Sequence, residues 1–105
     1  MLSPDDRAVF DFYPRKTTLR WGSVPGAATY SVEINWCQAE EAWILQNADW
    51  CREGTQTMEI VKNLAVTSYT FEFVGANPGQ WRVWAVDGSG AEGPKSPFRL
   101  FRYTH

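Results

Sequence analysis

Short runs in which apolar and polar residues alternate constrain the fold of this chain more than any other feature. The clearest run spans 29–36, where Tyr, Val, Ile and Trp fall on one side of an extended chain and Ser, Glu and Asn on the other. A period of two is what a strand with one buried face requires. No stretch carries a useful helical period, and turn residues separate the runs at short intervals. The pattern predicts an all-β domain, a sandwich or a barrel.

The same alternation locates the other strands. An edge strand is expected at 9–13, ended by Pro14 where an edge tolerates proline. Further strands are expected at 17–21, 58–64, 69–74, 80–87 and 95–103. Residues 37–57 break the alternation. Within them, 39–46 have helical spacing, so a short helical turn there is an alternative to a loop.

Length and N-terminal composition bear on domain organisation. The chain has 105 residues, the common size of one domain. We expect a single domain over 8–105 after a disordered or cloning-derived N-terminus at 1–7. The N-terminus is polar and carries no signal-peptide apolar region. That leaves a cytosolic protein or a domain excised from a longer chain, and we favour the excised domain.

Charge and hydropathy exclude two classes of partner. The net charge is −2, with 10 Lys and Arg scattered among 12 Asp and Glu. Nucleic-acid binders show a basic surplus or stripe, so we expect no nucleic-acid partner. No apolar run approaches the roughly 20 residues of a membrane helix, so we expect no direct membrane insertion.

Three segments, taken in order and spacing, resemble a fibronectin type III domain of the kind found in bacterial multidomain proteins. They are Thr18-Leu19-Arg20-Trp21 leading through Val24-Pro25-Gly26-Ala27 into Tyr30-Ser31-Val32-Glu33-Ile34, then Trp81-Arg82-Val83-Trp84-Ala85-Val86-Asp87, then Gly88-Ser89-Gly90 with Gly93-Pro94-Lys95-Ser96-Pro97. The resemblance covers residues 8–103. It implies an immunoglobulin-like sandwich of about seven antiparallel strands in two sheets. It implies no reaction, because the fold is a scaffold that hosts many functions.

Two departures from that family stand out. The position of the family's corner tyrosine, whose hydroxyl ties the corner to nearby backbone, is occupied by Gly79. The corner must therefore be held differently, and packing of Trp81 is a candidate. The second departure is an insertion over 37–51, bracketed by Cys37 and Cys51, that ordinary members lack.

The two cysteines admit two interpretations. A disulfide between Cys37 and Cys51 would staple the insertion and place the domain in an oxidising compartment. The alternative is two unpaired, buried thiols. We favour the disulfide because the two residues bracket an otherwise unanchored segment. A zinc site is not expected, because there is no second cysteine pair and the one histidine is the terminal His105.

No constellation for catalysis is evident, so we expect neither enzyme activity, nor a metal, nor a cofactor. A nucleophile–histidine arrangement needs a held imidazole, which a terminal histidine does not provide. The acid pairs at 5–6 and 40–41 fall in expected loops, and there is no phosphate-cradling glycine loop. A turn is a better interpretation of 87–89 than a calcium site.

The six tryptophans divide into three groups. Trp21, Trp36 and Trp81 fall on inward strand faces and are expected to fill the core. Trp84 is expected to point outward beside Arg82 and near Arg102 or Arg20, where a guanidinium can stack on its ring. Trp43 and Trp50 lie within the insertion. They either fold under as a satellite core or form an exposed aromatic platform for a sugar or peptide.

Taken together, the sequence predicts a non-catalytic binding or spacer module of a larger extracellular, periplasmic or cell-surface protein. The partner would be a protein or a carbohydrate, and a monomer is favoured. The alternative is a carbohydrate-binding module appended to a polysaccharide-active enzyme. Its candidate binding residues are Trp43, Trp50, Asn47 and Asp49, with Trp84 as a further candidate. Homotypic assembly through edge strands is a third hypothesis.

Overall fold

The computed structural model describes residues 2–37, 50–51 and 56–104, and within them the chain forms seven strands and no helix. The strands are β1 (Ala8–Phe10), β2 (Lys16–Arg20), β3 (Thr29–Trp36), β4 (Gln56–Leu64), β5 (Ser68–Glu72), β6 (Pro78–Val86) and β7 (Arg99–Tyr103). The all-β prediction is confirmed. None of the described residues belongs to a helix long and apolar enough to span a membrane. The helical turn considered at 39–46 lies outside the described residues.

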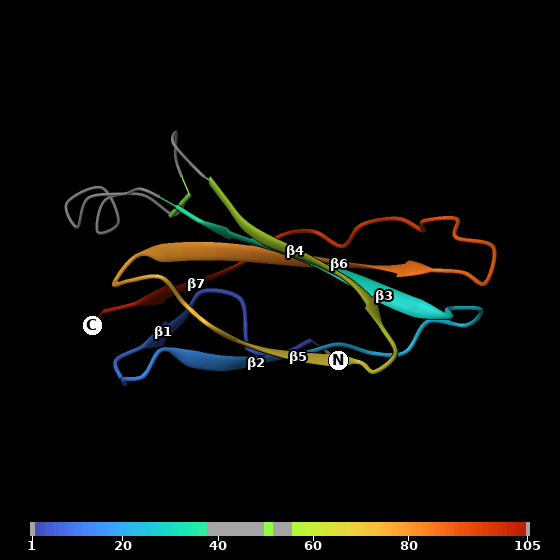
Figure 1. Cartoon of the computed structure of the whole chain (residues 1–105). Coiled ribbons are helices and arrows are strands. Elements are labelled where there is room, and N and C mark those ends of the chain that lie inside the picture. Colours follow the sequence, from blue (N-terminus) through green and yellow to red (C-terminus); the bar gives the residue numbers. More distant parts are fainter. Residues whose placement is uncertain (1, 38–49, 52–55, 105) are drawn as a thin grey trace.

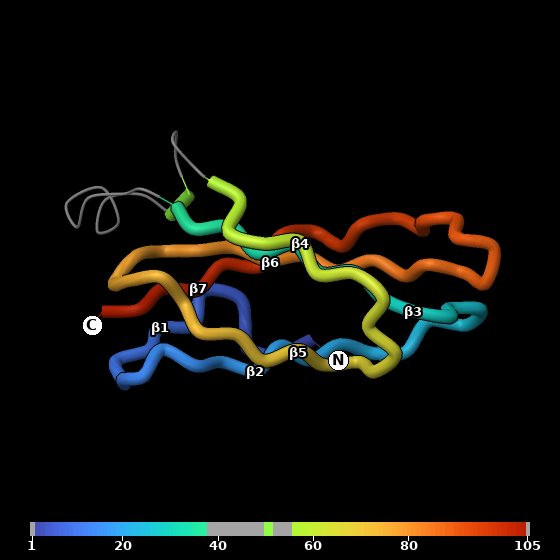
Figure 2. Tube along the Cα trace, viewed as in Figure 1, coloured from blue at the N-terminus to red at the C-terminus, as the bar shows by residue number. Residues whose placement is uncertain are grey.

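The strands form two facing sheets (Figures 1 and 2). One sheet has five strands in the order β1-β7-β6-β3-β4, and the other pairs β2 with β5. Neighbours are antiparallel except for β1 and β7, which run parallel with Ala8 opposite Phe101. This parallel pair departs from the antiparallel pairing expected throughout. It forms because the chain first bridges to β2 at Ser3 and then crosses to the free edge of β7.

The core lies between the sheets and is built from alternating residues of β3 and β6. Ile34 and Trp81 are almost fully buried there. Trp21, which follows β2, meets Trp81 with ring centroids 6.4 Å apart. Trp36 is half-buried and packs against the margin of the same cluster. The inward direction predicted for these three tryptophans is confirmed, and it follows from the period of two along each strand.

The corner before β6 has no room for a tyrosine. A Cβ built on Gly79 would lie 2.5 Å from Phe101 Cζ and 2.9 Å from the Asn35 carbonyl oxygen. A different tyrosine ties the sheets together: the hydroxyl of Tyr103 on β7 hydrogen-bonds the hydroxyl of Thr17 on β2. Burial raises the pKa of Tyr103, with opposing contributions from Thr17 and Arg15 too small to cancel it.

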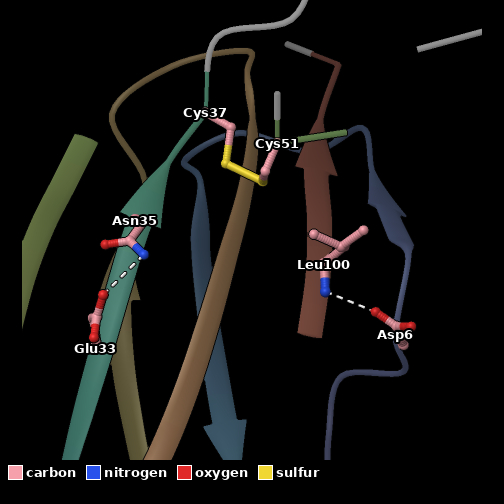
Figure 3. Close-up of a disulfide and its surroundings, with 6 residues drawn as sticks. All are labelled: Asp6, Glu33, Asn35, Cys37, Cys51 and Leu100. Carbon is pink, nitrogen blue, oxygen red and sulfur yellow. Dashed lines mark hydrogen bonds between the residues drawn. A yellow bond between two sulfur atoms is a disulfide. The ribbon is translucent and has the colours of Figure 1, made fainter. Parts of the chain in front are cut away.

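Residues 2–7 make hydrogen bonds to both sheets, and the N-terminal disorder expected from the sequence stays a prediction. Ser3 exchanges two backbone hydrogen bonds with Arg20, both 2.9 Å. The Leu100 N–H donates to the Asp6 carboxylate at 2.7 Å (Figure 3). The Arg7 N–H donates to the Leu100 carbonyl at 2.7 Å. Polar composition predicts disorder here, whereas these contacts are made by backbone groups of Ser3 and Arg7 and by the Asp6 carboxylate.

Two strands are shorter than predicted by two residues or more. β1 ends at Phe10 instead of Tyr13, because β7, its only strand partner, ends at Tyr103 directly opposite Phe10. β7 begins at Arg99 instead of Lys95. The preceding segment runs beside β6, where the N–H of Ser96 donates to the Val83 carbonyl, but Pro94 and Pro97 supply no N–H for a continuous ladder.

A disulfide joins Cys37 to Cys51, whose Cα atoms are 4.9 Å apart (Figure 3). Cys37 directly follows β3, is fully buried, and its N–H donates to the Pro78 carbonyl at 2.8 Å. The bridge therefore anchors residues 50–51 at the same end of the sandwich as the start of β6. The disulfide interpretation is confirmed and the free-thiol alternative is wrong.

Candidate binding groove

A groove of about 630 Å³ opens at the end of the sandwich where β3 begins and β6 ends. The connections before β3 and after β6 both lie at the right-hand end of the molecule in Figure 1. The groove surface is mostly apolar. Its principal side chains are Leu2, Trp21, Val24, Tyr30, Trp84 and Pro94, with Asp87, Glu92 and Lys95 among the polar ones.

The first wall is the turn between β2 and β3. Gly26 has φ of 83°, a left-handed conformation that favours glycine, and the Ala27 N–H donates to the Val24 carbonyl at 3.1 Å. The Val24 N–H donates to the Tyr30 hydroxyl at 2.8 Å. This bond fixes the turn to a core residue. Val24, at the rim, remains about half exposed.

The second wall is the segment after β6. The carboxylate of Asp87 accepts hydrogen bonds from the Ser89 hydroxyl and from the N–H groups of Ser89 and Ala91, and these bonds hold the pKa of Asp87 below its usual value. The Gly93 N–H then donates to the Ala85 carbonyl at 2.8 Å. The wall is therefore held against β6 by backbone hydrogen bonds.

Trp84 belongs to β6, and its side chain packs against the second wall. Its indole N–H donates to Glu92 at 2.6 Å, and the ammonium of Lys95 lies 4.6 Å from its ring centroid. Trp84 points away from the sandwich core, as predicted. It is nonetheless only 4% exposed, because the segment after β6 folds over it.

The guanidinium stacking predicted for Trp84 is not what the structure shows, since the cation on its ring is Lys95. Arg82 shares the outward face but lies directly opposite Glu33 on β3. Its guanidinium binds that carboxylate at 2.8 Å and stacks on Phe98 at 4.4 Å. A nearly buried carboxylate attracts a cation more strongly than an aromatic ring does, which explains why Arg82 pairs with Glu33 and does not stack on Trp84.

The carboxylate of Glu33 on β3 forms an ion pair with the guanidinium of Arg82 on β6. Burial opposes its charge, but hydrogen bonds from Arg82 and Asn35 outweigh burial and hold the pKa of Glu33 below its usual value. The Asn35 bond, 3.0 Å long, is drawn in Figure 3. The charge of Glu33 on the outer face of β3 is thus paired with that of Arg82.

Most polar side chains of the groove interact with other residues of its walls. Asp87 accepts hydrogen bonds within its own turn, Glu92 accepts one from the Trp84 indole, and the Lys95 ammonium lies over the Trp84 ring. In the described part of the chain, no group of three or more His, Cys, Asp or Glu is placed to hold a metal ion. A ligand in the groove would contact mostly apolar surface and would meet the charged side chains Asp87, Glu92 and Lys95. Such sites recognise shape and apolar groups.

The binding residues predicted from the sequence are not brought together in the part that the structure describes. Trp84 lines the groove. Trp50 lies with the disulfide at the opposite end, half-buried, with the guanidinium carbons of Arg7 and Arg102 at 5.9 and 5.5 Å from its ring centroid. Trp43, Asn47 and Asp49 lie outside the described residues.

Sequence reasoning missed most of the groove, including Val24, Tyr30, Glu92 and Lys95. A signal was available. The turn at 22–28 precedes β3 and the turn at 87–90 follows β6, and antiparallel neighbours bring such turns to one end of a sheet. Alternation along single strands does not by itself report that these two turns meet.

These features define the class: an immunoglobulin-like β-sandwich with a groove between two of its end loops. Comparison with solved structures agrees. The crystal structure of an Fn3-like protein from Clostridium thermocellum is similar, with a TM-score of 0.61 and 22% sequence identity, covering 100% of this chain and 94% of that chain. At this identity the likeness concerns the fold alone. The chain has a fibronectin type III-like fold, as the sequence resemblance predicted. No protein-family model and no curated protein matches it.

Proposed function

We propose that this domain is a non-catalytic binding module of a larger extracellular or cell-surface protein, and that it binds a protein partner in the groove. The observation that carries the proposal is the groove itself, with its apolar lining and its hydrogen-bonded walls. Binding to walls that are already ordered costs little conformational entropy, so apolar contact there converts efficiently into affinity.

The disulfide supports the extracellular part of this proposal. Structural disulfides persist in secreted and cell-surface proteins and are rare in reducing compartments. The Cys37–Cys51 bridge closes a loop with a sequence separation of 14 and ends at a fully buried sulfur. A bridge of this kind is structural in character.

The proposal is tested with a phage-displayed library of random linear peptides. Selected peptides are titrated against the wild type, Val24→Lys and a matched control, Ile60→Ser. Val24 and Ile60 are exposed to a similar degree, 48% and 50%, but Ile60 lies on β4, away from the groove. Val24→Lys is expected to weaken binding at least tenfold, because it places a charge against apolar surface, and Ile60→Ser to leave it unchanged. If no peptide is selected, or if all bind Val24→Lys normally, the binding proposal fails and a spacer role takes its place.

The carbohydrate-binding alternative has no observation in its favour over the groove, since the ring of Trp50 already has two guanidinium groups close to it. It stays testable beside the first proposal. A panel of soluble polysaccharides is titrated against the wild type and against Trp43→Ala and Trp50→Ala. Binding that both variants lose, and that Val24→Lys keeps, would move the function to the insertion.

A further inference from the structure

We propose that the partner in the groove is a second copy of this chain, whose β1–β2 loop enters it, so that molecules associate head to tail. The inference rests on the proposed function, because it names the occupant of the same groove. Three observations favour it: the exposed aromatic tip of the loop, the charges on each side, and the placement of loop and groove at opposite ends of the strands.

The β1–β2 loop presents unusual aromatic surface to solvent. Tyr13 is 71% exposed, the highest value among the large apolar side chains that the structure describes, and Phe12 beside it is 44% exposed. The Phe12 ring is anchored from below, with its centroid 5.5 Å from that of Phe10 and 5.7 Å from that of Tyr103. The loop is thus fixed to the core through Phe12, and Tyr13 projects from a held position.

Charge on the two surfaces is complementary. The loop itself carries one acid and one base, Asp11 and Arg15, and the adjoining first residue of β2, Lys16, adds a second base. The Arg15 guanidinium lies 5.2 Å from the Tyr13 ring centroid. The groove carries two acids and one base, Asp87 and Glu92 with Lys95. The loop together with Lys16 therefore has a net positive charge and meets a groove of net negative charge, which orients the encounter.

The positions of loop and groove determine the kind of assembly. The β1–β2 loop lies at the left-hand end of the molecule and the loops of the groove at the right-hand end (Figures 1 and 2). One molecule cannot place its own loop in its own groove. Contact between two different patches is heterologous and gives a ring or an open chain of molecules, depending on the rotation between neighbours. With loop and groove at opposite ends of the molecule, we expect the open chain, which has a free loop at one end and a free groove at the other. Association is then open-ended and grows with concentration.

A contact made by one loop buries less surface than a stable dimer requires, so the association is weak and the dilute protein is a monomer. Sedimentation velocity over a wide concentration range measures this directly. The wild type is expected to show a weight-average sedimentation coefficient that rises steadily without a plateau at the dimer. Tyr13→Ser and Val24→Lys, each alone, are expected to remain monomeric at every concentration.

Mixing the two variants is the decisive step. Tyr13→Ser keeps an intact groove and Val24→Lys keeps an intact loop, so their equimolar mixture is expected to form one-to-one dimers that grow no further. Ile60→Lys is the control, because it places a charge on the exposed edge strand β4 and blocks strand pairing there. It is expected to associate as the wild type does.

Three results would overturn the inference: a wild type that stays monomeric in concentrated solution, variants that associate normally, or a mixture that shows no dimer. Loss of association in Ile60→Lys would assign it to edge pairing of β4. Peptides that bind the groove of a protein showing no self-association would leave the proposed function standing and refute only the second copy as partner. Circular dichroism of each variant establishes that it is folded.

Discussion

Gly79 shows at the scale of one residue why this chain departs from the pattern that it resembles. A Cβ at this position would overlap two aromatic rings of the core, Phe73 and Phe101, and the Asn35 carbonyl oxygen of β3. A tyrosine at this position has no space, and the tie between the sheets is supplied by Tyr103 and Thr17. Packing of Trp81 was the candidate for holding the corner, and Trp81 is indeed buried, but a hydroxyl pair also links the sheets.

Gly79→Ala is expected to destabilise the domain by about 1–3 kcal/mol, the usual cost of overpacking a dense core. The new methyl group would overlap ring carbons 2.5 and 2.8 Å away. Gly88→Ala is the matched control, because a Cβ there meets nothing within 4 Å and its φ is not in the left-handed region. Urea denaturation of both variants measures the difference. Equal midpoints for the two would show that the corner can relax.

Glu33→Gln is expected to destabilise the domain at neutral pH by about 1.5–3 kcal/mol, the range for hydrogen bonds to charged groups. The pKa of Glu33 is lower in the folded state than the ordinary 4.5 because Arg82 and Asn35 outweigh the effect of burial. The stability that the charge contributes is therefore complete above pH 4.5 and is lost as the pH falls through the folded-state pKa. The stability difference between the two proteins should narrow as the pH falls below 4.5. Denaturation curves from pH 7 to pH 3 measure it, and a difference that does not change with pH would assign the effect to packing.

At the scale of elements, strands were predictable and the groove was not. Alternation identifies β3 and β6 because each has one face in the core, and a period of two is visible within a single segment. The groove depends on two connections about 60 residues apart, 22–28 and 87–96, and no local pattern reports their contact. Burial of Trp84 escaped prediction for the same reason, since Glu92 and Lys95 reach it from a loop.

The contribution of the Cys37–Cys51 disulfide to the free energy of unfolding can be estimated from the length of the loop that it closes. Replacing Cys37 and Cys51 together by Ala is expected to cost about 3 kcal/mol, because a closed loop of this length restricts the unfolded chain by roughly that amount. Guanidinium denaturation of the wild type and the double variant measures it. Dithiothreitol should lower the midpoint of the wild type only. A wild type indifferent to the reductant would mean that the bridge does not form.

At the scale of the whole molecule, the N-terminal segment joins the two sheets. Ser3 bonds to β2 in one sheet, and Arg7 and Asp6 bond to β7 in the other. Deleting residues 1–7 is therefore expected to lower the free energy of unfolding by about 2–6 kcal/mol, since at least the four hydrogen bonds just named, at about 0.5–1.5 kcal/mol each, are lost. Thermal denaturation of the shortened chain checks this. An unchanged midpoint would show that residues 1–7 do not stabilise the fold and would support the disordered N-terminus predicted from composition.

The parallel pairing of β1 with β7 also determines how the domain responds to tension. Force applied through the two termini pulls β1 backward from Ala8 and β7 forward from Tyr103. Because the two strands point the same way, their hydrogen bonds lie across the direction of pull and are loaded together in shear. An antiparallel terminal pair would be peeled open one bond at a time. If this domain stands in a chain under load, the hydrogen bonds between β1 and β7 must break together before the sandwich opens.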